Sequence, residues 1–291
     1  MNETSFKLLL IGLPETGKTT FLAALWHAVY KVKGELRLKE LPVQSKYIDD
    51  IWLKWVDCKP LGRTIQGPMQ FVEMKVVHLE ARETIELIFP DLSGETFEKG
   101  HFEDRQWSKE YDRLVSGAAG IILFIHPDKV YDKDLIVNAD RLAEGLQATN
   151  DADLELDKVE ISWSFDKVPT QVKIVDLLQL HLKHLKNGEL SRVVVVISAW
   201  DRIPKKSEIP KEWLEARLPL LHQYLHANQD WIDSEVFGVS AQGGDIEEDR
   251  DNLLRMRDAS LRIIVREKDG KDANICTPIT WVLRKIKPHG T

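Results

Sequence analysis

Cysteine and long apolar runs are both scarce in this chain. Its 291 residues include two cysteines, Cys58 and Cys276, which lie far apart in the sequence and fit a reducing cytosol. Its apolar runs are strand-length and fall well short of the roughly 20 residues that span a bilayer. The run from Leu8 to Ile11 is too short for a signal peptide, and Glu3 precedes it. We therefore expect a cytoplasmic protein without a membrane span.

Excess positive charge is also missing. The net charge is -7 and no strongly basic face is visible, which argues against nucleic acid as the main partner. We find no internal repeat and no low-complexity segment. The apolar fraction of 43% suits a globular core, and the charged fraction of 30% suits a solvated surface. The length allows one large α/β domain or two small ones.

The stretch IGLPETGKTT, at residues 11–20, carries the strongest motif. Gly12, Gly17, Lys18 and Thr19 have the spacing of a phosphate loop, in which inward-facing backbone N–H groups at a helix N-terminus attract phosphate oxygens. We expect Lys18 to reach the β- and γ-phosphates and the Thr19 hydroxyl to bind Mg²⁺. A chance glycine turn is the alternative, but a strand precedes the loop and an amphipathic helix follows it. The neighbouring residues assigned to the same nucleotide-binding loop are Pro14, Glu15, Thr16 and Thr20.

Alternating strand and helix patterns surround this motif and predict an α/β fold. The expected strands are Phe6 to Ile11, Phe71 to Leu79, Thr84 to Phe89, Gly120 to Ile125, Val193 to Ile197 and Glu235 to Val239. The expected helices are Thr19 to Lys31, Lys46 to Val56, Lys133 to Leu146, Gln171 to Leu185, Lys211 to Ala227 and Thr280 to Ile286. Continuous apolar strands are typical of a parallel sheet covered on both faces. We predict a doubly wound, mostly parallel sheet with its ligand at the carboxyl ends of the strands.

Two segments depart from this alternation. Leu261 to Arg266, followed by Gly270, predicts a small C-terminal hairpin. Asn150 to Val168 fits no element well and lengthens the connection between two core strands. We therefore place an insertion at about residues 127–170.

A second motif follows the strand that ends at Phe89. We expect the Asp91 carboxylate to hold Mg²⁺ through water, and the backbone N–H of Gly94 to meet a γ-phosphate. This Asp-x-x-Gly pattern differs from the Asp-Glu pair of many ATPases. It resembles the start of switch II in the translation-factor-related GTPases, the class that contains the Ras-like proteins.

Two further motifs resemble the base-reading segments of these GTPases. Ser198-Ala199-Trp200-Asp201 resembles the Asn/Thr-Lys-x-Asp pattern, whose aspartate accepts two hydrogen bonds from guanine, but the lysine that stacks along the base is replaced by Ala199. Ser240 and Ala241 resemble the segment whose backbone N–H contacts guanine O6. The order and spacing of the motifs favour GTP, and ATP stays as the alternative.

The catalytic part of the resemblance falls on three further residues. Thr64, in a glycine-flanked loop, is the candidate for the switch I threonine that closes over Mg²⁺ and the γ-phosphate, with a solvated turn threonine as the alternative. Arg63 is a candidate arginine finger, and a plain surface arginine is the alternative. Glu95 stands where Ras-like proteins carry the glutamine that orients water, and its charge would repel the γ-phosphate. We therefore expect slow intrinsic hydrolysis, unless a partner or a conformational change repositions a catalytic group. Lys18 completes the set of candidate catalytic residues.

The pattern over most of the chain resembles the bacterial double-GTPase families of predicted conflict and phage-defence systems. The residues that carry this resemblance are Phe21 to Leu25, Asp91 to Phe97, Ser198 to Asp201 and Thr277 to Leu283. It implies one GTPase-like domain over residues 1–291 that binds GTP or GDP with Mg²⁺, acts on a protein effector or a second GTPase subunit, and serves antiviral defence. A nucleotide-binding module with little turnover and an ATP-using P-loop enzyme remain alternatives. His181 and His184 lie one helical turn apart, but no third metal ligand can be placed, which favours a solvated helix face.

Overall fold

An eight-stranded sheet forms the centre of the protein in a computed structural model, which describes residues 5–31, 34–62, 70–91, 109–130, 168–185, 190–204 and 209–283. The strand order is β2-β3-β4-β1-β5-β6-β7-β8. The strands are β1 (Ser5–Gly12), β2 (Leu36–Leu38), β3 (Gln70–His78), β4 (Glu83–Asp91), β5 (Gly120–Ile125), β6 (Ser191–Ser198), β7 (Ile232–Ser240) and β8 (Ile264–Arg266). The strands β4, β1, β5, β6 and β7 run parallel, and β3, β2 and β8 pair antiparallel at the two edges.

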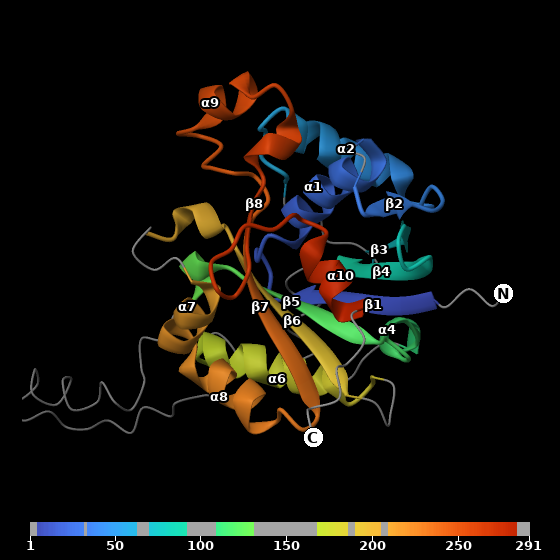
Figure 1. Ribbon diagram of the computed structural model, residues 1–291, viewed down its shortest axis with the longest axis vertical. Helices are drawn as coiled ribbons and strands as arrows, with labels where there is room; N and C mark the ends of the chain where they lie inside the picture. The colour runs from blue at the N-terminus through green and yellow to red at the C-terminus, as the bar shows by residue number, and fades with distance from the viewer. Residues whose placement is uncertain are drawn as a thin grey trace, which may run out of the picture.

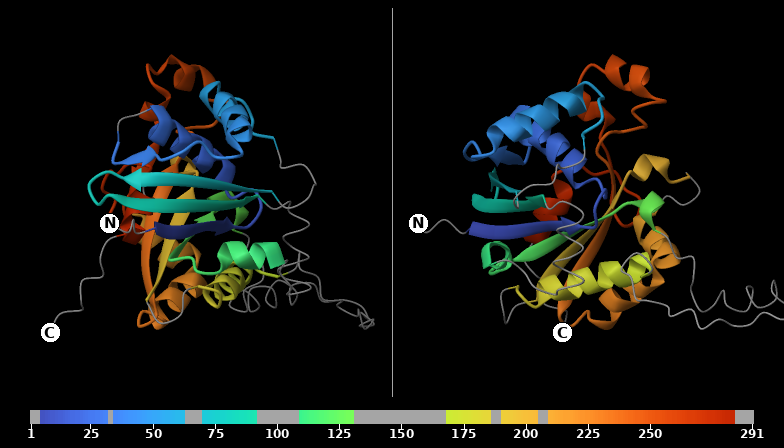
Figure 2. Two further views of the ribbon diagram at one scale, coloured as in Figure 1. Left: turned by 90° about the vertical axis from the view of Figure 1, so that its right-hand side faces the viewer. Right: turned by 180° about the vertical axis from the view of Figure 1, so that it is seen from behind.

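Helices cover both faces of the sheet (Figures 1 and 2). One face carries α1 (Lys18–Lys31), α2 (Ser45–Val56) and α10 (Thr277–Leu283), and the other carries α4 (Lys109–Val115), α6 (Thr170–Leu182), α7 (Pro210–Arg217) and α8 (Pro219–Ala227). Every residue of β5 is buried, as a strand covered on both faces requires. This doubly wound, mostly parallel arrangement confirms the predicted fold class.

The helix α10 fills the core face over the start of β5 and β6. Ile279 and Val282 are buried there. An ideal Cβ on Gly120 would lie 2.7 Å from Val282 Cγ1, so only glycine lets the helix approach β5 this closely. The Arg192 guanidinium, at the start of β6, donates to the Val282 carbonyl. Residues from distant parts of the sequence therefore complete this part of the core together.

Several predicted elements differ from the structure. The helix expected over Lys211 to Ala227 is two helices, because Pro219 cannot continue α7 and Leu218 takes a non-helical conformation with φ -133° and ψ 57°. The short strand β2 was not predicted. The segment expected to form a C-terminal hairpin contains a 3-10 turn at Ala259–Arg262, followed by β8. The strand β8 joins the main sheet beside β7. A single bridge between Arg266 and Asp272 closes the turn that follows.

The expected insertion lies mostly outside the described residues, as does the helix expected at residues 133–146. The structure describes the two segments that flank this insertion. The 3-10 turn η2 (Pro127–Lys129) follows β5, and α6 begins at Thr170. The Thr170 hydroxyl donates to the Lys129 carbonyl at 3.2 Å, so the two flanking segments lie side by side. No helix in the described ranges is both long and apolar enough to cross a membrane.

The register of the parallel strands brings their carboxyl ends to one edge. Gly12 pairs with Phe124 across β1 and β5, and Ser198 pairs with Val239 across β6 and β7. Leu9 pairs with Ile88, so Asp91 stands at the level of Gly12 on the neighbouring strand. Loops that follow these strands must therefore gather at this edge, where ligands bind in open α/β sheets.

Candidate nucleotide-binding site

The phosphate-loop segment turns tightly between β1 and α1. An ideal Cβ on Gly12 would lie 2.6 Å from the Phe124 carbonyl oxygen and 2.7 Å from Thr16 Oγ1, so the loop packs against β5 without room for a side chain. Gly17 has φ +84°, a conformation that favours glycine. Phe21 N–H donates to the Gly17 carbonyl at 2.9 Å as α1 begins. The two motif glycines are thus required by close approach in one case and by backbone conformation in the other.

The Lys18 amine lies over the concave side of this loop. Its Nζ donates to the carbonyl oxygens of Gly12 and Leu13, both at 2.9 Å, and lies 3.3 Å from Thr16 Oγ1. Thr16 in turn donates to the Leu13 carbonyl at 2.8 Å. The carbonyl groups of the loop therefore hold the Lys18 ammonium group beside the loop backbone, where it could contact a bound anion.

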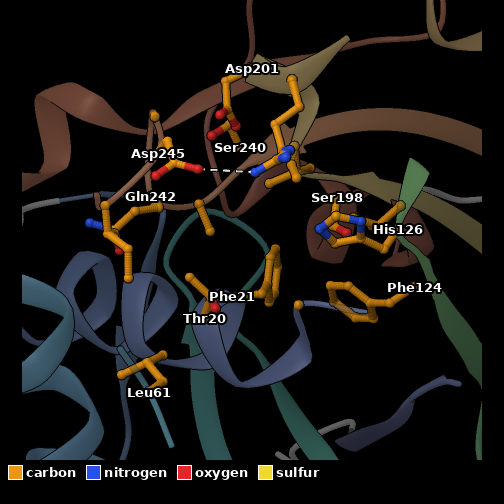
Figure 3. A pocket seen from close by; sticks show the side chains of 18 of the residues that line it. Thr20, Phe21, Leu61, Phe124, His126, Ser198, Asp201, Ser240, Gln242 and Asp245 are labelled. Carbon is orange, nitrogen blue, oxygen red and sulfur yellow. Dashed lines mark hydrogen bonds and ion pairs between the residues drawn. The ribbon is translucent and has the colours of Figure 1, made fainter. Parts of the chain in front are cut away.

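A cavity of about 360 Å³ opens beside the loop and α1 (Figure 3). It is lined by residues from α1, the loop after α2 and the ends of β5, β6 and β7. The sequence-predicted residues that line it are Gly17, Thr20, Asp201, Ser240 and Ala241. A smaller cavity of about 20 Å³ lies against Gly12, Pro14 and Lys18. The segments predicted to bind phosphate and base therefore lie close together at the carboxyl ends of neighbouring parallel strands.

The turn that carries Asp201 is fixed by Trp200. Ala199 has φ +45°, and Trp200, which is buried, begins the 3-10 turn η5 (Trp200–Arg202). An ideal Cβ on Gly238 would lie 2.5 Å from Trp200 Cε3 and closer still to Cδ2, so the indole ring lies directly on the β7 backbone. Ser198 donates to the Ile125 carbonyl at 3.0 Å, which ties the same turn to β5.

A family model described as Double-GTPase 1 matches residues 9–282. The chain belongs to the Double-GTPase 1 family. This assignment makes the fold a P-loop GTPase-type domain and confirms the family resemblance seen in the sequence.

Solved structures give distant matches to the Double-GTPase 1 chain. A bacterial selenocysteine-specific elongation factor, EF-Sec, is 14% identical, with a TM-score of 0.37 over 86% of this chain and 28% of that chain. The GTP-bound Ski7 GTPase-like domain of S. cerevisiae is 14% identical, with a TM-score of 0.39 over 83% and 44%. The signal recognition particle receptor SRb-GTP/SRX complex of Chaetomium thermophilum is 14% identical, with a TM-score of 0.41 over 81% and 90%. This chain spans less than half the length of the EF-Sec and Ski7 chains, and the search of curated proteins found no match.

Arg202 also lines the cavity, and the sequence analysis did not predict it. Its Nε lies 2.8 Å from Asp128 Oδ2, and its Nη1 lies 3.1 Å from Asp245 Oδ2. Backbone N–H groups of Glu247 and Glu248 lower the pKa of Asp245, and Arg202 lowers it further. The only sequence signal was its place directly after Asp201, and no motif marks its partners.

His126 was missed as well. It lines the cavity at the end of β5, and its Nδ1 accepts the Asp128 backbone N–H at 3.2 Å. Partial burial lowers its pKa, so the neutral ring is favoured near neutral pH. Figure 3 shows it on the same side of the cavity as Phe124 and Ser198.

The loop after β7, which carries Ala241, is tied to α2. The Trp55 indole N–H donates to the Ala241 carbonyl at 3.0 Å. The Gly243 backbone N–H donates to Ser240 Oγ at 2.9 Å, so the Ser240 hydroxyl stabilises the turn between these two residues. Lys59, Pro60 and Leu61, just after α2, line the facing side of the cavity. The cavity wall therefore depends on two segments that are far apart in the sequence.

Several predicted residues are not tested by this arrangement. Arg63, Thr64, Gly94 and Glu95 lie outside the described residues, and Asp91 is described only as the end of β4. Thr19 lies half-buried in the first turn of α1. Glu15 pairs with Lys129 of η2 at the rim of the phosphate loop.

The interpretation of His181 as part of a solvated helix face was wrong. His181 is fully buried, and its Nδ1–H donates to the Leu177 carbonyl at 2.7 Å. Its Nε2 therefore accepts the Tyr111 hydroxyl at 2.6 Å, and burial raises the pKa of that phenol. His184 lies 3.0 Å from Asp112. Within the described residues, no group of three or more His, Cys, Asp or Glu side chains suits a metal ion.

Proposed function

We propose that this chain is a Mg²⁺-dependent guanine-nucleotide-binding protein that hydrolyses GTP slowly and acts as a nucleotide-controlled switch for a partner protein. One observation carries the proposal. Gly17 of the phosphate loop, Asp201, Ser240 and Ala241 line the same cavity of about 360 Å³ at the carboxyl ends of the parallel strands. A nucleoside triphosphate needs this combination of an anion-binding loop and a neighbouring base pocket.

The residues divide into a phosphate side and a base side. On the phosphate side, the backbone of residues 12–17 and the Lys18 amine would bind the β- and γ-phosphates, after Lys18 exchanges the loop carbonyls for phosphate oxygens. On the base side, the Asp201 carboxylate would accept from guanine N1 and N2, and the backbone of Ser240 and Ala241 would meet O6. Where guanine offers N1–H and N2–H to the carboxylate, adenine has an acceptor nitrogen and a C–H group, so this arrangement favours GTP over ATP.

The available donors fit magnesium. Thr19 lies in the first turn of α1 next to the loop, and Asp91 ends β4 at the level of Gly12. A hydroxyl and a carboxylate are the hard oxygen ligands that Mg²⁺ takes beside phosphate and water, and we assign Thr64 as a further ligand. Bound there, the ion would neutralise charge on the β- and γ-phosphates.

Slow turnover is proposed from the chemistry of the catalytic segment. Glu95 brings a negative charge close to the γ-phosphate, which opposes a closed, water-positioning loop. Arg63 is the proposed cation in cis that offsets charge on the transferring phosphoryl group, and Thr64 is the proposed switch I residue. Order in these segments would then depend on the γ-phosphate, which is how a GTPase reports its state to a partner.

The partner is proposed to be a protein effector or a second GTPase subunit, in a bacterial antiviral defence system. The defence setting rests on the family resemblance. A cytoplasmic location would suit both.

Equilibrium titration with GTP, GDP, ATP and ADP, each with and without Mg²⁺, tests this proposal. We expect guanine nucleotides to bind at least tenfold more tightly than adenine nucleotides, and Mg²⁺ to strengthen GTP binding. Equal affinity for ATP and GTP would refute the guanine assignment. Ala199, where a base-stacking lysine is missing, favours a second candidate, a binding module with little turnover. Single-turnover hydrolysis separates the two, because the module would bind GTP without releasing phosphate.

A further inference from the structure

We propose that Arg202 is a specificity-determining residue that supplies the flat cationic surface for the purine base, in place of the lysine missing at Ala199. The inference rests on the proposed function, because it assigns a contact within the same nucleotide site. It begins from the observation that Ala199, Asp201 and Arg202 all line the cavity of about 360 Å³. Arg202 lies three positions after Ala199 on the same turn, so a cation at either residue borders the same cavity.

The two ion pairs of Arg202 hold its guanidinium by the edges. Nε is paired with Asp128 at 2.8 Å and Nη1 with Asp245 at 3.1 Å. Figure 3 marks the bond to Asp245 with a dashed line. Because N–H groups lie in the plane of the guanidinium, partners at two edges fix that plane and leave its faces for other contacts. Planar stacking on an aromatic ring is a property of arginine that lysine lacks.

Stabilisation of the fold is a weak explanation for this arrangement. The side chains of Arg202 and Asp128 are each 48% exposed and that of Asp245 is 33% exposed. Ion pairs at such exposure contribute about 0–1 kcal/mol. Two carboxylates on one exposed guanidinium add little to stability, whereas they orient a planar group at the cavity wall.

The supports of Arg202 come from the segments that surround the base pocket. Asp128 lies in η2, directly after His126, which lines the cavity. Asp245 lies on the loop after β7, whose Ser240, Ala241 and Gln242 line the cavity from the same side (Figure 3). One guanidinium therefore connects the three loops that would hold the purine.

Lys59 is the other cation that lines the described part of the cavity, and it is a less suitable candidate. Its amine lies 2.8 Å from Asp57 Oδ2, on the loop after α2, and both side chains are more than half exposed. Its ion pair is with a residue two positions away on the same loop, whereas Arg202 is held by residues of two other loops.

Equilibrium titration of the full chain with a fluorescent GDP, and competition with unlabelled GDP and UDP, tests the assignment. Arg202→Ala should weaken GDP binding by roughly 3- to 30-fold, the range expected for a cation on an aromatic face. It should lower the preference for GDP over UDP, because a pyrimidine offers less surface to stack. Arg202→Lys should fall between the wild type and Arg202→Ala. The exposed α7 variant Arg217→Ala, which also removes one positive charge, should change GDP affinity less than twofold.

A rescue variant separates a base contact from a structural connection between loops. Ala199→Lys in the Arg202→Ala background should recover most of the lost GDP affinity, because the motif lysine returns. It restores no bridge between Asp128 and Asp245. Unchanged GDP affinity in Arg202→Ala, equal losses for GDP and UDP, or no rescue by Ala199→Lys would each overturn the assignment. A wild-type protein that binds GDP while Arg202→Ala behaves normally refutes this inference alone, whereas a wild type that binds no guanine nucleotide refutes the proposed function and this inference with it.

Discussion

Replacing Gly238 with alanine would place a methyl group against the Trp200 ring. An ideal Cβ at this position lies 2.5 Å from Trp200 Cε3, well inside van der Waals contact. Trp200 is buried and β7 is a central strand, so neither side can move away cheaply. Asp201 follows Trp200 directly, and a displaced indole would shift the proposed guanine contact.

Two opposing effects set the size of the change. Glycine-to-alanine substitution in a strand ordinarily stabilises by about 0.4–1 kcal/mol, because the unfolded chain loses freedom. Overpacking a core costs about 1–3 kcal/mol. The clash is severe here, so we expect a net loss of about 1–2 kcal/mol, or roughly 2–8 °C in Tm. Loss of one charge-assisted hydrogen bond from Asp201 would weaken GDP binding by about 1.5–3 kcal/mol, roughly 10- to 150-fold.

Thermal denaturation and GDP titration of Gly238→Ala measure both effects. Gly34→Ala is the matched control, because no heavy atom lies within 4 Å of an ideal Cβ placed there. Trp200→Leu added to Gly238→Ala should recover stability by making room for the methyl group. Should Gly238→Ala match or exceed the wild type in Tm and bind GDP equally well, the ring does not constrain the Asp201 turn and the argument is refuted.

Substitutions at three other positions test the proposed chemistry. Lys18→Ala should abolish nucleotide binding with a Tm near that of the wild type, because the amine contacts loop carbonyls at the surface of the site; a folded variant with normal GTP affinity would contradict the phosphate assignment. Asp201→Asn should shift preference from GTP to xanthosine triphosphate, because an amide donates where the carboxylate only accepts, and competition titrations would show it. Glu95→Gln should raise single-turnover GTP hydrolysis about tenfold, equivalent to about 1.4 kcal/mol, whereas Glu95→Ala should not. A slower Glu95→Gln protein would mean that the glutamate itself orients water.

The phosphate loop and the central strands were predictable because their signals are local. Gly12 to Thr19 sets both the turn and the helix start within eight residues. The continuous apolar runs of β5 and β6 indicate burial on both faces. Pro219 also carried a local signal, a proline inside a helical pattern, which the periodicity of the apolar residues outweighed.

The rest of the site depends on pairings that local pattern does not encode. Arg202 meets Asp128 and Asp245 only because parallel strands bring three loops to one edge. Nothing in the sequence around Gly238 indicates that glycine is needed there. The requirement comes from the Trp200 ring, which lies against the backbone at that position. His181 has the spacing of a helix-face residue, but α4 covers that face with Tyr111.

The packing of α10 has a consequence for biosynthesis. Val282 closes over Gly120, so the start of β5 on that face lacks its α10 cover until residues 277–283 have been made. About 160 residues separate the two contact points, which corresponds to roughly 8–32 s of synthesis at 5–20 residues per second. During this interval the start of β5, joined by β6 once residues 191–198 have been made, leaves apolar surface open on that face. Contacts this distant in sequence also slow refolding from denaturant, since the long loop must close before the helix contributes any stability.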